Sequence, residues 1–543
     1  MSLIKLFFKN KTMKNFINKN IALGGVALSL VVSSCIKDLD RQPFNEVTSA
    51  TVYNDPAAYK QVGAKLYAGL MLTGQQGPAG DDRTKDIKGQ DEGFSSYLRN
   101  YWYLQVLTTD EAVIAWNDAG LPELHQMKWS SNNAFVRGFY NRVFYQIASC
   151  NEFIRETSDA KLSERGVTGA VLADAKALRA EARFLRALSY WHALDLFGGN
   201  VPFVTESDLV GSAPPKQTNP KDLFAYIESE LKAIDGELVD ARKNEYARAD
   251  KAAAWMLLAK LYLNAEAQGQ GNRYADAATY AKKVIDAGYT LQAKYEDLFK
   301  ADNHNSPEVI WALAADGNRS QTWGGMTFLC HAPVGGSMPA SSYGLDGGWG
   351  GVRVTPSFVK LFADPTGKTD KRAMFYTDGQ KLEINEIPTF TDGYAMPKYK
   401  NITSTGAVGS NLTHPDTDFP MFRLADAYLM YAEAAARGAG DKALAVEYIN
   451  KLRVRAYGNA TGNITSSELT PDFVLAERAR ELSWEGSRRT DLIRFAKYTG
   501  SSYLWSWKGG VKDGASVQDY LKIFPLPSTD LTANPNLIQN TGY

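Results

Sequence analysis

Cysteine and histidine are scarce in this chain of 543 residues, which has three of the former and five of the latter. Two thiols besides Cys35 are too few for a disulfide framework, although one bridge between Cys150 and Cys330 stays open. Cys150 falls in a helical pattern and is expected in the core. The five histidines show no metal-ligand spacing, and motifs for nucleophilic or phosphate chemistry are missing. The sequence therefore predicts no cofactor.

Basic residues are in deficit once the N-terminal segment is set aside. Residues 1–34 carry five lysines and no acid, so the remaining 509 residues have 55 basic and 60 acidic side chains, a formal net charge of −5. A nucleic-acid partner favours a basic face, so none is expected. By length alone these 509 residues allow two to four domains.

The N-terminal segment has the pattern of an export signal. The five lysines precede an apolar run, Ile21–Val32, which is too short for the roughly 20 residues that span a bilayer. Ser33-Ser34-Cys35 then follows, which is typical of a bacterial lipoprotein cleavage site. We expect a signal peptide over 1–34, a lipidated Cys35, and a tether to residue 50. Met13 is an alternative start, because Met13 to Cys35 is a complete signal by itself. The alternative is an ordinary cleaved signal with an incidental cysteine.

Helical periodicity dominates the rest of the chain. Trp255, Leu258, Ala259 and Tyr262 have the spacing of a tetratricopeptide first helix, with Ala in place of Gly. The sequence predicts an all-α dominated fold of such helical hairpins, at about 135–290 and 421–497. The predicted helices are Phe135–Glu156, Val171–Phe197 (ending at Gly198-Gly199), Lys251–Ala267, Tyr274–Ala287, Arg423–Gly438, Lys442–Arg455 and Pro471–Lys497.

Two segments, at about 73–130 and 302–420, are instead rich in Gly, Asn, Asp, Ser and Pro and are predicted to be long functional loops. They contain Trp116, Trp323 and Trp349, the last two beside glycines. A Trp in such surroundings has few neighbours to bury it, so its ring is expected to be displayed. A flat indole matches the apolar face of a pyranose ring, which favours a sugar platform over packing beneath a loop.

The remaining chemistry-bearing residues are weaker candidates. Asp91-Glu92 and Asp110-Glu111 offer carboxylates, but a glycosidase needs two that face each other across a bond, and nothing in the sequence fixes their separation. The other Trp residues singled out are expected to be core or packing residues, with the last two ambiguous: Trp191, Trp255, Trp484, Trp505 and Trp507.

Several stretches resemble a known family nearly end to end. They are Arg183–Leu188, Asp195–Gly198, Arg248–Ala253, Phe422–Ala425, Glu485–Leu492 and Phe524–Pro527. With them the chain resembles the SusD family of surface glycan-binding lipoproteins of Bacteroidetes. The resemblance implies one domain over 51–543, with minor β-structure in a loop-built glycan site, and a TonB-dependent (SusC-like) transporter as partner. Ile36–Asp40 also resembles the tag that directs such lipoproteins to the outer leaflet of the outer membrane.

Four further runs resemble the starch-binding members of the family: Gly89–Gly93, Phe390–Gly393, His414–Asp418 and Trp507–Gly510. That resemblance implies starch or malto-oligosaccharide as ligand, bound without catalysis. The residues implied to bind it are Trp116, Trp323, Trp349, Asn117 or Asp118, Arg99 and Asp91. Ile114 stands where those members have one more Trp, so one stacking partner is expected to be missing. A structural Ca²⁺ near Asp302, Asp416 or Asp418 is conceivable but not expected.

Overall fold

The computed structural model describes residues 49–75, 85–209 and 211–543. Contacts divide the chain into two compact units, Met1–Asp55 and Pro56–Tyr543. In the first unit the described part contains the short helix α2 (Ser49–Val52). The predicted signal peptide, Cys35 and the tether up to residue 48 lie outside the described residues. Among the helices that the structure describes, none is both long and apolar enough to cross a membrane.

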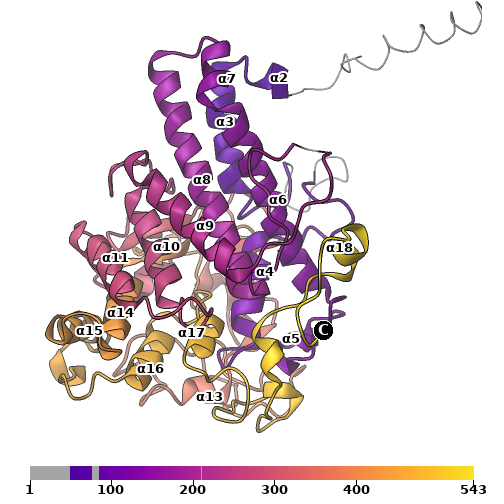
Figure 1. Cartoon of the computed structure of the whole chain (residues 1–543). Coiled ribbons are helices and arrows are strands. Elements are labelled where there is room, and N and C mark those ends of the chain that lie inside the picture. The colour runs from indigo at the N-terminus through magenta and orange to yellow at the C-terminus, as the bar shows by residue number, and fades with distance from the viewer. Residues whose placement is uncertain (1–48, 76–84, 210) are drawn as a thin grey trace, which may run out of the picture. The chain divides into compact units, whose positions relative to one another are not determined.

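The first part of the second unit is a group of long helices, in which α3 and α6 both pack against α8 (Figure 1). Asn133 caps the start of α6 by accepting from the backbone N–H groups of Phe135 and Val136. Gly198, with a left-handed φ of 73°, ends α8 where the sequence predicts a stop. The helices of this group are α3 (Pro56–Ala68), α6 (Ala134–Glu156), α7 (Asp159–Glu164), α8 (Gly169–Phe197) and α9 (Pro220–Ala233).

Two helical hairpins follow and pack side by side through α11 and α14 (Figure 1). Asp250 caps the helix that begins at Lys251, and Asp441 caps the helix that begins at Lys442. Each carboxylate accepts hydrogen bonds from backbone N–H groups of the first helical turn. The predicted helix-dominated fold with hairpins is confirmed. The hairpins are α10 (Lys251–Leu263) with α11 (Tyr274–Asp286), and α14 (Leu424–Ala436) with α15 (Lys442–Tyr457).

The continuous helix predicted over Pro471–Lys497 is wrong. The structure divides it into α16 (Pro471–Glu481) and α17 (Arg488–Arg494). Trp484 and Gly486, between the two helices, have left-handed φ values of 61° and 74°. Trp484 is nevertheless buried, and its backbone N–H donates to the Glu111 carboxyl at 3.2 Å. Apolar spacing continues through this break, which is why periodicity does not reveal it.

The segments predicted as loops contain more regular structure than expected. Tyr97–Leu107 forms α4 (Tyr97–Trp102) and a π-helical turn, η1 (Tyr103–Leu107), and is buried throughout. Its aromatic side chains pack against α6, so this part of 73–130 belongs to the core. The other short elements are α5 (Pro122–Gln126), α12 (Gly325–His331), α13 (Pro356–Val359), α18 (Ser528–Ala533), and the 3₁₀ turns η2 (Ile234–Gly236), η3 (Tyr295–Phe299), η4 (Asn303–Asn305), η5 (Ala340–Tyr343), η6 (Ala460–Gly462), η7 (Lys508–Gly510) and η8 (Asp519–Lys522).

Two small antiparallel sheets organise the remaining segments. In one, β1 (Val113–Ile114) pairs with β3 (Val352–Arg353). In the other, β2 (Val309–Leu313) pairs with β4 (Phe419–Arg423), with an irregular register. Because β2 and β4 are the two ends of the segment 314–418, their pairing closes that segment at its base.

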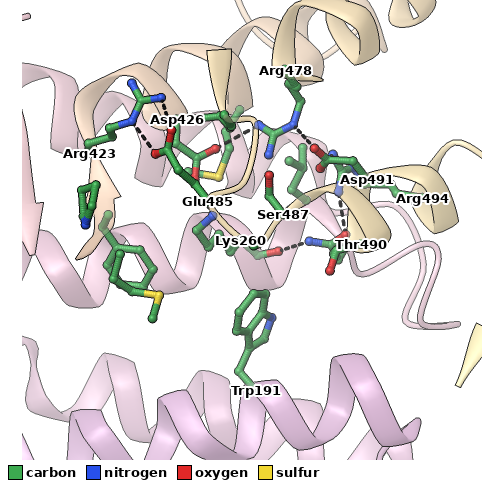
Figure 2. Close-up of a pocket in the computed structure, with 18 of the residues that line it drawn as sticks. Trp191, Lys260, Arg423, Asp426, Arg478, Glu485, Ser487, Thr490, Asp491 and Arg494 are labelled. Atoms are coloured by element: carbon green, nitrogen blue, oxygen red, sulfur yellow. Dashed lines mark hydrogen bonds and ion pairs between the residues drawn. The ribbon is translucent and has the colours of Figure 1, made fainter. Parts of the chain in front are cut away.

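A buried ionic network connects this base to the helices (Figure 2). Arg423, at the end of β4, is 1% exposed and pairs with Glu308 at 2.8 Å, Glu481 at 2.7 Å and Glu485 at 2.6 Å. These partners come from the residue before β2, the end of α16 and the α16–α17 break. The three coulombic attractions hold the pKa of Arg423 above its usual value despite its burial. One cation therefore joins three segments of the chain.

A second group of buried ion pairs lies around Asp491 on α17 (Figure 2). Arg478 pairs with both Asp426 and Asp491 at 2.9 Å, and Arg494 pairs with Asp491 at 2.7 Å. The side chains enclose a cavity of about 30 Å³, the size of one or two water molecules, into which Trp191 points. This cavity belongs to the structural core.

Both cysteines in the described residues are buried free thiols, Cys150 in α6 and Cys330 in α12. Burial raises the pKa of the Cys150 thiol to about 12 and also raises that of Cys330. The bridge left open by the sequence is not formed, and the expected core position of Cys150 is confirmed.

The network predicts a large cost for losing Arg423. Arg423→Met leaves the Glu308, Glu481 and Glu485 carboxylates buried without their shared partner, so the free energy of unfolding is expected to fall by about 3–5 kcal/mol. Chemical denaturation measures this change. The matched control is Lys282→Met, which removes an exposed pair with Asp286 and is expected to cost less than about 0.5 kcal/mol. Equal effects of the two substitutions would contradict the role of the network.

Candidate functional site

Pairing of β1 with β3 brings Trp116 beside residues 347–351, which precede β3 and which we call the Trp349 turn. The strands continue in a hydrogen bond from Ala115 N–H to the Gly351 carbonyl at 2.8 Å. The indole N–H of Trp116 then donates to the Trp349 carbonyl at 3.3 Å. A Cβ at position 351 would lie 2.6 Å from the Trp116 ring, so only glycine allows this approach. Residues 116 and 349, distant in sequence, are thereby held as neighbours.

The Trp349 turn is fixed from behind by the end of α12. Trp349 N–H donates to the His331 carbonyl at 3.0 Å, and Gly351 N–H donates to the Ala332 carbonyl at 2.7 Å. The His331 ring stacks on the Trp349 ring with centroids 4.9 Å apart. Its two nitrogens lie 2.7 and 2.9 Å from the carbonyl oxygens of Gly347 and Thr413. His331 thus supports both the ring and the backbone that carries it.

Trp323, just before α12, completes the aromatic surface. Its ring centroid lies 6.4 Å from that of Trp349, which in turn lies 6.2 Å from that of Trp116. Trp349 is tilted by 48° and 47° from these two neighbours, and all three rings are partly exposed. His414 packs 5.1 Å from Trp323, and burial lowers the pKa of its imidazole, which favours the neutral ring. We call Trp116, Trp323 and Trp349 the aromatic platform.

Arg99 and Asp91 lie at the Trp323 side of the platform. Arg99 Nη1 donates to the carbonyls of Gly93 at 2.8 Å and Trp323 at 3.3 Å, and its Nε donates to the Tyr103 hydroxyl at 2.9 Å. In the part of the chain that the structure describes, Arg99 Nη2 makes no hydrogen bond. Asp91 is exposed, and one of its carboxylate oxygens accepts from the Gly93 N–H at 2.8 Å. Arg99 therefore positions the platform and still has a free donor.

Asn117 and Asp118 directly follow Trp116 and are exposed. Among the described residues neither side chain has a hydrogen-bond partner, so both have acceptors available to a ligand. Ile114 is fully buried in β1 and presents nothing to the platform. The structure thus brings together all seven residues implied to bind ligand, and their binding role remains a prediction.

Sequence reasoning missed the residues behind the platform. Phe328 on α12 contacts the Trp116 ring edge-on at 6.0 Å, and the Arg99 guanidinium lies 4.6 Å from the Phe328 ring. His331 and His414 perform the same supporting role for the other two rings. Each is a single residue without a local motif, so only the three-dimensional arrangement reveals its function.

The carboxylates considered for catalysis have other partners. Asp110 is buried and accepts two hydrogen bonds from Arg488, at 2.7 and 2.6 Å, and one from Tyr503. Burial raises the pKa of Glu111 to about 8, and its oxygen accepts from the Trp484 backbone. Asp110 and Glu111 are core residues.

The Trp residues expected in the core or in packing contacts fall into two groups. Trp191, Trp484 and Trp505 are buried. Trp255 and Trp507 are half-buried, with their indole N–H groups donating to Asp235 and to the Ile384 carbonyl.

The acids considered for a structural Ca²⁺ accept hydrogen bonds from the protein. Asp302 accepts from Ser404, and Asp416 accepts from Gly317 and Ser410. Asp418 accepts from the Ala315 N–H at 2.7 Å and from Tyr246. Among the described residues, no group of three or more His, Cys, Asp or Glu side chains is arranged to hold a metal ion.

Comparison with known proteins places this chain and its fold in one class, the SusD-type glycan-binding proteins. A profile of the SusD family matches residues 364–543. The starch-binding protein SusD of Bacteroides thetaiotaomicron is 36% identical over 95% of this chain and 97% of its own length. The chain belongs to the SusD family.

Solved structures agree on the fold. A SusD-like carbohydrate-binding protein from Bacteroides fragilis has a TM-score of 0.69 at 20% identity, covering 90% of this chain and all of that one. Surface glycan-binding protein A from Bacteroides thetaiotaomicron, in complex with laminarihexaose, has a TM-score of 0.66 at 20% identity, covering 89% and 99%. These similarities extend over nearly the whole chain and include both helical hairpins.

The support from His331 can be tested without a ligand. His331→Ala removes the ring behind Trp349 and both contacts to the carbonyls of Gly347 and Thr413. We expect the backbone amides of residues 349–351 to exchange their hydrogens at least about tenfold faster, because the turn opens locally more often. Hydrogen–deuterium exchange with mass spectrometry measures this rate. His304→Ala, at an exposed position, is the control; unchanged exchange at 349–351 in His331→Ala would refute the support.

Proposed function

We propose that this protein binds starch and malto-oligosaccharides at the cell surface, without catalysis, and passes them to a TonB-dependent (SusC-like) transporter of the outer membrane. The observation that carries the proposal is the aromatic platform, in which three partly exposed indole rings from separate segments form one contiguous surface. The 36% identity to a starch-binding relative supports the choice of ligand.

The shape of the platform suits a curved chain of glucose units. Consecutive rings are tilted by 47° and 48°, so the surface is not flat, and a helical α-glucan presents successive sugar faces at changing angles. Indole faces stack on the apolar C–H faces of pyranose rings. Asn117, Asp118, Asp91 and the free donor of Arg99 are placed around the rings to bond the hydroxyl groups.

The buried Ile114, which replaces a stacking Trp, is expected to lower the affinity of the platform for a glycan. If each ring face contributes on the order of 1 kcal/mol, a site with one ring fewer binds several-fold more weakly. Trp323 offers a larger face than a smaller aromatic residue would, which offsets part of this loss.

The proposal is for binding without catalysis, because Asp91 and Glu92 differ in environment and do not form a matched catalytic pair. Glu92 is buried, and burial raises the pKa of its carboxyl. Asp91 is exposed and is used by a local turn. A glycosidase needs two carboxyls facing each other across the bond it cleaves. Continuing release of reducing sugar from starch by the purified protein would refute this part.

We further propose that Cys35 carries a lipid and anchors the protein in the outer leaflet of the outer membrane. Residues 1–34 would be removed as signal peptide, and residues 35–50 would connect the anchor to a single domain over 51–543. Radiolabelled palmitate incorporated by native protein, and lost in Cys35→Ser, tests the lipid. Protease accessibility on intact cells tests the exposed side.

Two alternatives keep the fold. The platform could serve a different polysaccharide, since loops vary more readily than the scaffold that carries them; a glycan array separates this from starch. The chain could also be a structural transporter subunit without a glycan site, in which case no glycan on the array would bind.

The decisive prediction concerns the rings. Residues 36–543 contain the whole compact unit Pro56–Tyr543, so this fragment is suitable for calorimetric titration with maltoheptaose. We expect the double substitution Trp323→Ala with Trp349→Ala to weaken binding at least about thirtyfold, because two of three stacking faces are lost. The matched control is Trp255→Phe on α10, which is expected to bind as the native protein does.

Two results would contradict the starch assignment. One is the absence of any heat of binding with maltoheptaose. The other is binding that the double substitution leaves unchanged.

A further inference from the structure

A second cleft, of about 590 Å³, lies outside the aromatic platform and shares no residue with it. Its walls come from residues 293–296, Tyr343, residues 366–376, residues 397–400 and Arg455 of α15. This volume is within the range of sites for small organic ligands. At the edge of the cleft the hydroxyl of Tyr376 lies 3.0 Å from that of Ser337.

The charge of this cleft differs from that of the rest of the protein. Lys294, Lys371, Lys400 and Arg455 line it, against one carboxylate, Glu296. Residues 35–543 have a net negative charge, so three lysines against one carboxylate are not an average feature of this surface, even with the paired Arg455 set aside. Such a lining attracts an anion.

Lys400 has only a distant carboxylate partner within the protein. Its ammonium is 3.9 Å from Glu296, and that carboxylate already accepts from Lys300 at 3.1 Å. Among the described residues, the Lys400 ammonium makes no hydrogen bond. Burial lowers the pKa of the Lys400 ammonium, and attraction to Glu296 offsets this only in part. An anion in the cleft would give the Lys400 ammonium the hydrogen-bond partner that it lacks.

Arg455 contributes less free charge to the cleft than the lysines do. Its side chain is 4% exposed, and its two Nη atoms pair with Glu308 and Glu481 of the buried network. Its Nε has no hydrogen-bond partner in the described part of the chain. The charge of Arg455 is therefore largely compensated by the buried network, and the three lysines carry the excess charge of the cleft.

Aromatic side chains also line the cleft. Tyr343, Phe375 and Tyr376 line the cleft together with the cations. An inorganic anion would make no use of these rings, whereas the C–H face of a pyranose would pack against them. We propose that this cleft is a second ligand site, specific for a sugar that carries a carboxylate, such as a uronic acid, with Lys400 binding the carboxylate and Tyr376 contacting the sugar ring.

Calorimetric titration of residues 36–543 with D-glucuronate, D-glucose and inorganic sulfate tests this site. We expect D-glucuronate to bind and D-glucose to give no heat. Lys400→Gln should weaken D-glucuronate binding at least about tenfold, because a charged hydrogen bond is lost. Tyr376→Leu should weaken D-glucuronate several-fold and leave sulfate unchanged. Lys282→Gln, on α11, is the control and should match the native protein.

The same samples are titrated with maltoheptaose, which should bind all three variants with native affinity and so show that they are folded. Loss of maltoheptaose binding in native protein would overturn the proposed function, while the D-glucuronate result would still decide the cleft. The cleft proposal is overturned if native protein does not bind D-glucuronate, or if Lys400→Gln binds it unchanged. It is also overturned if sulfate binds equally well and Tyr376→Leu affects neither ligand, which would indicate an adventitious ion only.

Discussion

The buried guanidinium of Arg423 is the interaction on which the site depends. It pairs with Glu308 before β2, with Glu481 at the end of α16 and with Glu485 in the α16–α17 break. One charge therefore joins the β2–β4 sheet to the C-terminal helices. Strands β2 and β4 bracket the segment 314–418, which carries two of the three platform rings. Burying these charges is costly unless each is paired, so the network favours one arrangement of the segments over its alternatives. The helical body thereby fixes the base of a long excursion of the chain.

Fixing the base of the segment does not by itself fix the three indole rings of the platform. Each ring is also held in place by a side chain that packs behind it. Phe328, His331 and His414 support Trp116, Trp349 and Trp323 respectively. Arg99 connects the Gly93 turn to the Trp323 backbone. Side chains that are already ordered lose little conformational freedom when a ligand binds, which favours affinity from few contacts. The platform is therefore preformed, on loops positioned by a rigid scaffold.

Local patterns were sufficient to predict most of this molecule. Periodicity of 3.6 residues located α6, α8 and both hairpins, Gly198-Gly199 marked the end of α8, and glycines beside Trp323 and Trp349 marked displayed rings. The missed features depend on long-range contacts. The α16–α17 break rests on a left-handed Trp484 that apolar spacing conceals, and Tyr97–Leu107 is helical because it packs beneath α6. His331 carries no local signal, since its role depends on a turn that is distant in sequence.

The central claim is that the three rings form one surface before any ligand is present. The most direct measurement is a pair of crystal structures of residues 36–543, one without ligand and one with maltoheptaose. The account predicts glucose units stacked across Trp116, Trp323 and Trp349, whose side chains keep the positions described here in both crystals. Sugar bound away from these residues, or rings that come together only in the complex, would contradict a preformed platform.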